Sequence, residues 1–183
     1  MQHIINQIHK RLIKDRNTVA VAESCTGGLL CSLLTQQPAS SQYFILGVVA
    51  YSNKAKEVIL KIPHSVLIKN GAVSKIVALR MAQSIRKIAK TDFGIGITGI
   101  AGPSGGTPEK PVGTVFIAID SKNKNVRKKI AFGDNSKRFS VVGKVLYTFP
   151  HHKKFHFTGN RTAVRKKAAL KALELLYENI YCY

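Results

Sequence analysis

The sequence predicts an α/β fold, a single three-layer α/β/α domain (residues 1–183) in which a mixed, mainly parallel sheet lies between two layers of helices. Apolar, β-branched runs of strand length alternate along the chain with longer amphipathic stretches of helical period, which is typical of βαβ units. The 183 residues, of which 45% are hydrophobic, suit one domain with a substantial core. The candidate catalytic residues directly follow predicted strands, at the sheet edge where such folds bind ligands.

The N-terminal elements are predicted from periodicity. Four apolar residues of segment 1–16 fall on one helical face, so we expect an amphipathic helix that packs on the sheet. The β-branched run 18–22 predicts the first strand, and 29–36 predicts the helix that follows it. The nearly continuous apolar run 43–51 predicts a second strand, which we expect to be central in the sheet.

The later elements follow from caps and from the same periodicities. Serine and asparagine caps predict two helices, from about residue 52 to 61 and from 74 to 90. Strands are expected over 93–97 and 113–120. The spaced apolar residues of 162–178 predict a closing helix.

The turn after the first strand, Glu23-Ser24-Cys25-Thr26-Gly27-Gly28, is the segment on which the function depends. Ser24 and Cys25 are both candidate nucleophiles, and the glycines allow a ligand to approach the backbone closely. The first turn of the next helix has unpaired N–H groups, which predicts an anion-binding cradle beside the nucleophile. A helix N-cap followed by small residues for tight packing would explain the same pattern.

Two other strand ends carry candidate chemistry. Lys56 follows the second strand, and its neutral amine could take the proton of Ser24 if burial lowered its pKa by about 3 units. An exposed lysine without this role is the alternative interpretation. The glycine-rich segment 98–107 leaves the third strand, so its backbone N–H groups could reach a phosphate or an oxyanion. A flexible connector would explain Gly105 and Gly106 equally well.

Several separated segments resemble the CinA C-terminal domain family in order and spacing, over about residues 18–120 and 155–178. Together these segments are more specific than any one of them. A C-terminal segment, Phe157 to Arg161 and then Val164-Arg165 in the closing helix, resembles the family's Phe-x-Gly-Asp-Arg element, with Asn160 in place of the aspartate. The other segments are Ala22 to Gly28, Tyr51-Ser52-Asn53 with Lys56, Gly71-Ala72-Val73-Ser74, and Thr98 to Pro103 followed by Lys110-Pro111-Val112-Gly113-Thr114-Val115.

The resemblance implies hydrolysis of the carboxamide of nicotinamide mononucleotide to nicotinate mononucleotide and ammonia, in pyridine-nucleotide salvage. It assigns Ser24 as the nucleophile and Lys56 as its base, with no metal or cofactor, and it implies a homodimer. Cys25 is the competing nucleophile, because a thiol is intrinsically the better one. The substrate-binding positions that the resemblance assigns are Tyr51, Thr26, Gly27, Thr98, Gly99, Gly102 and the cation Arg161.

Segment 121–154 departs from the family pattern. We interpret it as a basic insertion with the pattern of an added hairpin. Because it precedes Arg161 in the chain, it affects where Arg161, and so the phosphate contact, is expected to lie. From Ser121 to Leu170 there are fourteen Lys and Arg against one acidic residue, Asp134.

The net charge of +20 raises an alternative function, because a strongly basic chain can bind nucleic acid. A non-catalytic nucleic-acid-binding protein related to competence or damage would use segment 121–171, but that segment lacks the aromatic and glycine pattern of known modules, and we do not favour it. A member that binds the nucleotide without turnover is a further alternative. No apolar run reaches the ~20 residues that span a bilayer, and the three cysteines lack metal-ligand spacing, so we expect a cytoplasmic protein without a metal site.

Overall fold

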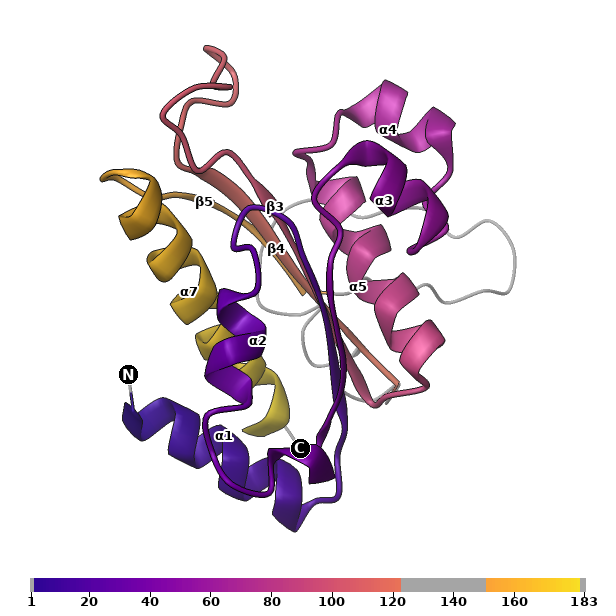
Figure 1. Ribbon diagram of the computed structural model, residues 1–183, viewed down its shortest axis with the longest axis vertical. Coiled ribbons are helices and arrows are strands. Elements are labelled where there is room, and N and C mark those ends of the chain that lie inside the picture. The colour runs from indigo at the N-terminus through magenta and orange to yellow at the C-terminus, as the bar shows by residue number, and fades with distance from the viewer. Residues whose placement is uncertain (1, 123–150, 182–183) are drawn as a thin grey trace, which may run out of the picture.

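The computed structural model describes residues 2–122 and 151–181, which form one sheet between two layers of helices (Figure 1). β1 pairs in parallel with β2 and β3, whereas β4 is antiparallel to both of its neighbours, β3 and β5. All strands described other than β4 therefore run in one direction, and the predicted mixed, mainly parallel sheet is confirmed. In spatial order the strands are β2 (Phe44–Val49), β1 (Val19–Glu23), β3 (Phe93–Gly99), β4 (Thr114–Ser121) and β5 (His151–His156).

The helices divide between the two faces of the sheet (Figure 1). The predicted helices are confirmed within a few residues, and a short 3₁₀ turn, η1 (Ser40–Gln42), precedes β2. α4 was not predicted, since it has only seven residues and no side-chain cap. On one face lie α1 (Gln2–Lys14), α2 (Leu29–Leu34) and α7 (Arg161–Tyr181), and on the other lie α3 (Asn53–Val58), α4 (His64–Asn70) and α5 (Lys75–Ala89).

The centre of the sheet is packed on both sides. Every residue of β1 is buried, which fits a parallel strand covered by helices on each face. On β3, Gly94 and Gly96 lie directly under α5, where a Cβ atom would collide with the backbone carbonyls of Ala82 and Ala78. The two glycines therefore allow α5 to lie very close to the sheet.

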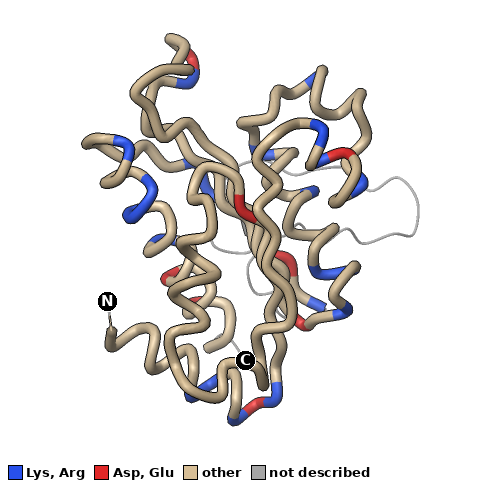
Figure 2. Tube along the Cα trace, in the orientation of Figure 1, with Lys and Arg blue, Asp and Glu red and all other residues tan. Residues whose placement is uncertain are grey.

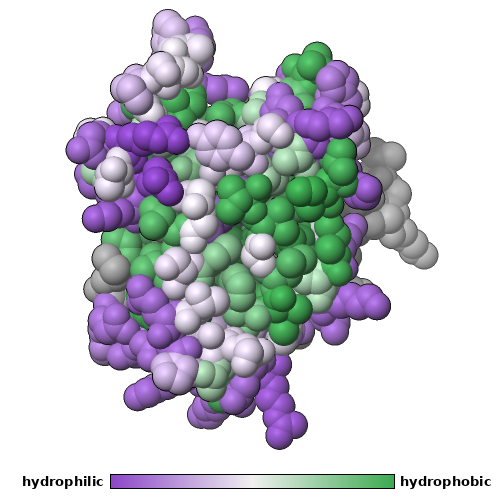
Figure 3. Space-filling model, viewed as in Figure 1, coloured by the Kyte–Doolittle hydropathy of each residue, from purple (hydrophilic) through white to green (hydrophobic). Residues whose placement is uncertain are grey.

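β2 is an edge strand, and the prediction that it is central was wrong. Its residues alternate between half-buried and exposed, and the side chains of Ile45 and Val49 are about half exposed. Figure 3 shows hydrophobic residues over the side of the molecule on which β2 lies. A run of apolar residues does not distinguish a buried strand from an edge strand whose outer side chains are also apolar.

The predicted basic insertion lies mostly outside the described residues. Only its two ends, up to residue 122 and from 151 onward, are described. Residues 151–154 belong to β5, with His152 opposite Ala118 of β4, so this end of the expected insertion is part of the sheet. Among the described residues, no helix has the length and apolar character needed to cross a membrane.

The order of the strands explains where the functional turn lies. From β1 the chain passes through α2 on one face to β2, and then through α3, α4 and α5 on the other face to β3, which lies on the far side of β1. The carboxyl end of β1 is thus a topological switch point, where open α/β sheets form a ligand-binding crevice. Ser24 directly follows this end.

Candidate active site

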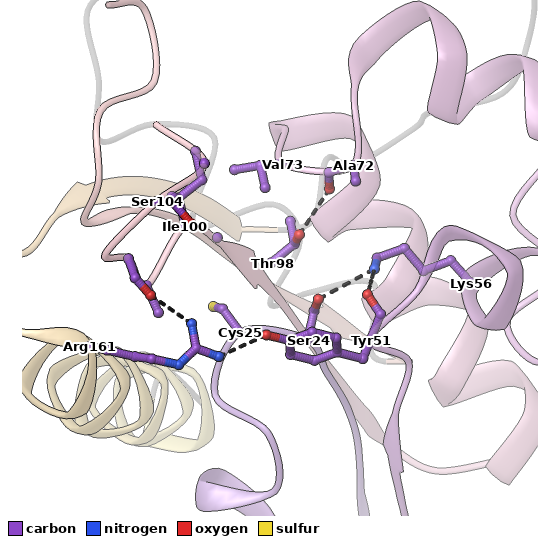
Figure 4. Close-up of a pocket in the computed structure, with 14 residues that line it drawn as sticks. Ser24, Cys25, Tyr51, Lys56, Ala72, Val73, Thr98, Ile100, Ser104 and Arg161 are labelled. Atoms are coloured by element: carbon purple, nitrogen blue, oxygen red, sulfur yellow. Dashed lines mark hydrogen bonds between the residues drawn. The ribbon is translucent and has the colours of Figure 1, made fainter. Parts of the chain in front are cut away.

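A cavity of about 330 Å³ opens at the carboxyl ends of β1, β2 and β3 (Figure 4). Its volume is within the roughly 300–1,000 Å³ that is usual for small-molecule sites. The lining residues come from the three strand ends, from α3, from the loops after α4 and β3, and from the start of α7. They are Ser24, Cys25, Tyr51, Lys56, Ala72, Val73, Thr98, Gly99, Ile100, Ala101, Gly102, Ser104, Gly105 and Arg161.

Lys56 and Ser24 meet at the base of this cavity (Figure 4). Lys56 Nζ lies 3.3 Å from Ser24 Oγ, and both side chains are buried. Ser52 caps α3 by accepting a hydrogen bond from the Ala55 N–H, which fixes the helix that carries Lys56. The alternative of an exposed lysine is therefore wrong, because only 1% of Lys56 is accessible to solvent.

The surroundings of Lys56 favour a neutral amine. Burial lowers the pKa of Lys56 from its ordinary value of 10.5, and no carboxylate lines the cavity in the described part of the chain. Nζ donates hydrogen bonds to the backbone carbonyls of Ala50, at 2.9 Å, and Tyr51, at 3.1 Å. A neutral amine donates its two N–H bonds to these carbonyls and turns its lone pair to the Ser24 hydroxyl, whereas an ammonium would donate to all three oxygens.

Cys25 lines the cavity but is poorly suited to be the nucleophile. The pKa of its thiol is raised to about 12, mainly by burial and also by the nearby Glu23, although its own backbone N–H and the cations Lys56 and Arg161 lower it. The thiol is therefore protonated at neutral pH, whereas thiol chemistry requires the thiolate. The sulfur lies against Gly99, where a Cβ atom would be 3.0 Å from Sγ.

Arg161 crosses the mouth of the cavity from the first residue of α7 (Figure 4). Its guanidinium donates to the Gly102 carbonyl at 2.8 Å and to the Tyr51 hydroxyl at 2.8 Å. Both acceptors are uncharged, so in the described part of the chain no carboxylate neutralises this exposed cation. Its charge is therefore available to an anionic ligand.

The remaining predicted positions divide into two groups. Thr98 and Gly99 line the cavity, and the Thr98 hydroxyl donates to the Ala72 carbonyl at 2.9 Å, which ties the end of β3 to the loop after α4. Thr26 and Gly27, by contrast, do not line it. Thr26 is fully buried, and Gly27 lies behind the turn against Arg165, because the chain turns away from the cavity after Cys25.

The expected anion cradle at the start of α2 is filled by the protein itself. The buried carboxylate of Glu23 accepts hydrogen bonds from the N–H groups of Gly28, Leu30 and Cys31, at 3.0, 3.3 and 2.8 Å. The prediction of a ligand site there is corrected, because these donors are already used. Among the described residues, no three His, Cys, Asp or Glu side chains are grouped to hold a metal ion.

Comparison with known proteins places these features in one family. The family model of the CinA C-terminal domain matches residues 1–148. This chain belongs to the CinA C-terminal domain family. A CinA-like protein of Thermotoga maritima is 42% identical over 176 residues, which cover 94% of this chain and 36% of the relative. A CinA-like protein of Desulforapulum autotrophicum is 44% identical over 131 residues, which cover 72% of this chain and 31% of the relative.

The chain thus spans about a third of the length of these curated CinA relatives. Solved structures of similar size match almost all of it. A CinA superfamily protein of Klebsiella pneumoniae superposes with a TM-score of 0.81 and 27% identity over 99% of this chain and 98% of that one. The competence/damage inducible protein CihA of Agrobacterium tumefaciens superposes with a TM-score of 0.77 and 32% identity, over 96% and 95%.

The departure of this CinA-type chain from the family's Phe-x-Gly-Asp-Arg element has a structural explanation. The Asn160 side-chain oxygen accepts a hydrogen bond from the Ala163 N–H at 3.0 Å, and the Asn160 carbonyl accepts from Val164 at 2.9 Å. Asn160 therefore caps α7, a position that favours asparagine and aspartate about equally. Arg161 keeps its place at the start of the helix.

Two residues of this CinA-type site were missed as functional candidates from sequence alone. Glu23 is a residue of the turn motif to which the sequence pattern gives no role, although an acidic residue at the buried end of a strand needs a polar partner. Arg165 lies outside the apolar stripe of the closing helix, and the sequence alone gives it no role. It lies four residues after Arg161, and this spacing places both on one side of a helix, which was the available signal.

Proposed function

We propose that this protein hydrolyses the carboxamide of nicotinamide mononucleotide to nicotinate mononucleotide and ammonia, with Ser24 as nucleophile and Lys56 as general base. The observation that carries the proposal is the 3.3 Å separation of the two buried groups, with the other Lys56 hydrogen bonds directed to carbonyls. Membership of the CinA C-terminal domain family supports the same reaction.

The first step forms an acyl-enzyme. Neutral Lys56 takes the Ser24 hydroxyl proton while Oγ attacks the carboxamide carbon and the carbonyl electron pair moves to oxygen. As the tetrahedral intermediate collapses, the C–N bond breaks and the Lys56 ammonium returns its proton to the departing nitrogen, which leaves as ammonia. Proton and charge are balanced without another catalytic group.

The second step releases the product. Water enters the place of ammonia, Lys56 takes its proton, and the oxygen attacks the ester carbon. The bond to Ser24 Oγ then breaks, and Lys56 returns the proton to Oγ. The product acid gives its remaining proton to solvent and leaves as nicotinate mononucleotide, with a carboxylate in place of the amide.

The negative oxygen of each tetrahedral intermediate requires hydrogen-bond donors that are already in place. The Gly27 N–H donates to the Ser24 carbonyl at 3.1 Å, so it is not available for this purpose. The Cys25 N–H, directly after the nucleophile, is the donor that we assign. Cys25 thus contributes through its backbone.

An anionic substrate is supported by the charges at the cavity. Lys56 and Arg161 line it, and no Asp or Glu does so within the described part of the chain. Arg161 lies at the mouth and Lys56 at the base, so a mononucleotide would present its phosphate to Arg161 and its carboxamide to Ser24. Lys and Arg residues also lie along the first half of α7 (Figure 2), and their positive charge favours the approach of anions.

The test is ammonia release from nicotinamide mononucleotide by the purified protein. Ser24→Ala and Lys56→Ala should be inactive, whereas Cys25→Ala should turn over. Ser104→Ala is the matched control, because it removes another cavity hydroxyl, whereas the Lys56 hydrogen bonds go to Ser24, Ala50 and Tyr51. An active Ser24→Ala variant beside an inactive Cys25→Ala variant would move the nucleophile to the thiol.

A folded wild-type protein that releases no ammonia would contradict the proposal. Calorimetric titration with nicotinamide mononucleotide would then identify a member that binds without turnover. Salt-dependent titration with DNA would test the nucleic-acid alternative, because phosphate contacts weaken steeply with salt.

A further inference from the structure

Arg165 makes the main polar contact between α7 and the turn that carries Ser24. Its guanidinium donates from both Nε and one terminal nitrogen to the Thr26 carbonyl, at 3.2 and 2.9 Å. This contact joins residues 139 positions apart in the chain. Arg165 is half-buried, and among the described residues it forms no ion pair with a carboxylate.

Gly27 leaves the space in the turn that this guanidinium occupies. Gly27 has a φ of +60°, the left-handed region that favours glycine, and a Cβ atom there would lie 3.1 Å from the Arg165 terminal nitrogen. Glycine therefore serves both the backbone conformation and the space that Arg165 occupies.

The Glu23 carboxylate holds the α2 end of the turn through the N–H groups of Gly28, Leu30 and Cys31, but the middle of the turn has few polar contacts. Its internal backbone hydrogen bonds, from Gly27 to Ser24 and from Leu29 to Thr26, are 3.1 and 3.4 Å long. The Thr26 hydroxyl is buried without a hydrogen-bond partner, so the side chain provides no polar anchor. α2, the helix that follows, has only six residues. The backbone carbonyl held by Arg165 is thus the polar anchor of the turn on the α7 side.

We propose that Arg165 is a positioning residue that holds the Ser24 turn in its reactive geometry through the Thr26 carbonyl. Arg165 does not line the cavity, and it acts through the backbone two residues after the nucleophile. Arg161, one helical turn earlier, faces the ligand side of the cavity, so α7 fixes the nucleophile relative to the cation at the mouth. The effect on catalysis rests on the proposed amidase function, whereas the effect on the turn does not.

The kinetic test separates positioning from binding. Arg165→Ala should lower kcat for nicotinamide mononucleotide about 10- to 100-fold, the size of loss expected when a nucleophile is displaced by a fraction of an ångström to 1 Å. KM should stay close to the wild-type value, because the cavity lining is unchanged. Arg165→Lys, which keeps the charge and one donor, should recover part of kcat. Lys166→Ala, at an exposed neighbouring position, is the control.

A second readout needs no turnover. Cys25 is 5% exposed and follows Ser24, so alkylation of its thiol by iodoacetamide, measured by peptide mass spectrometry, reports on the turn. Arg165→Ala should accelerate Cys25 alkylation, and Arg165→Lys should do so less. If Arg165→Ala does not fold, Arg165→Lys provides the comparison with wild type for both readouts.

The combined outcomes decide the proposal. A fall in kcat with faster Cys25 alkylation supports it. A wild-type kcat in Arg165→Ala, or a fall in kcat with an unchanged alkylation rate, overturns it. If wild type releases no ammonia, the proposed function fails, and the alkylation rates alone decide whether Arg165 holds the turn.

Discussion

Lys56 Nζ lies 3.3 Å from Ser24 Oγ and donates its other hydrogen bonds to the carbonyls of Ala50 and Tyr51. The two carbonyls belong to the residues that directly follow β2, whereas Ser24 follows β1. Two adjacent parallel strands thus supply the base's acceptors and the nucleophile. In its neutral form, which burial favours, the amine donates its two hydrogens to these carbonyls and keeps one lone pair for the serine proton.

The rate of the proposed reaction should rise with pH along a single ionisation. Only neutral Lys56 can take the Ser24 proton, and burial lowers its pKa, so the midpoint should lie below 10.5. The measurement is kcat across the neutral and alkaline range. Lys56→Arg should be inactive throughout, because a guanidinium stays protonated. A rate independent of pH over this range would contradict the role of Lys56.

The free energy of unfolding should depend on pH through the same ionisation of Lys56. The folded pKa of Lys56 lies below its unfolded value of 10.5, so the unfolded state binds more protons between the two values. The free energy of unfolding of wild type should therefore fall as pH falls through this window, relative to that of Lys56→Met. Urea unfolding of both proteins at several pH values measures the difference. Lys54→Met, at an exposed position of α3, is the matched control.

Arg161→Ala should raise KM for nicotinamide mononucleotide while leaving kcat nearly unchanged. A hydrogen bond to a charged group contributes about 1.5–3 kcal/mol, which corresponds to roughly 10- to 100-fold in KM. Nicotinamide riboside, which lacks the phosphate, should show the same KM with wild type and the variant. An equal rise in KM for both compounds would mean that Arg161 does not bind the phosphate.

Glu23→Gln should destabilise the protein without touching the cavity. The carboxylate accepts three backbone N–H groups at the start of α2, and a glutamine would present its own N–H₂ to some of them. We expect a loss of about 2–3 kcal/mol in the free energy of unfolding, measured by urea titration. Glu178→Gln, which alters an exposed glutamate, should change it by less than about 0.5 kcal/mol.

Asn160→Ala should cost about 1 kcal/mol by removing the cap of α7. Asn160→Asp should not, because aspartate accepts the same N–H and restores the family's usual residue. Thermal unfolding should show a fall in Tm of about 2–4 °C for the alanine variant. An equal fall for both variants would show that the cap is not what Asn160 contributes.

Local pattern predicted much of the fold and the site. Hydrophobic periodicity and caps predicted α1, α5 and α7 within a few residues, and the motifs identified Ser24, Lys56 and Arg161 as the candidate residues. It failed where the answer depended on neighbours distant in sequence. The apolar run of β2 predicted a central strand, but the strand order places it at an edge.

The sequence by itself determined the fold class, the order of the motifs and the types of residue available for chemistry, because these depend on contacts between residues close in the chain. Only the tertiary structure decided which of them meet. It brought Lys56 to Ser24, filled the α2 donors with Glu23, and joined Arg165 to Thr26 across 139 positions. Such contacts depend on the packing of helices on a shared sheet, and no local periodicity specifies them.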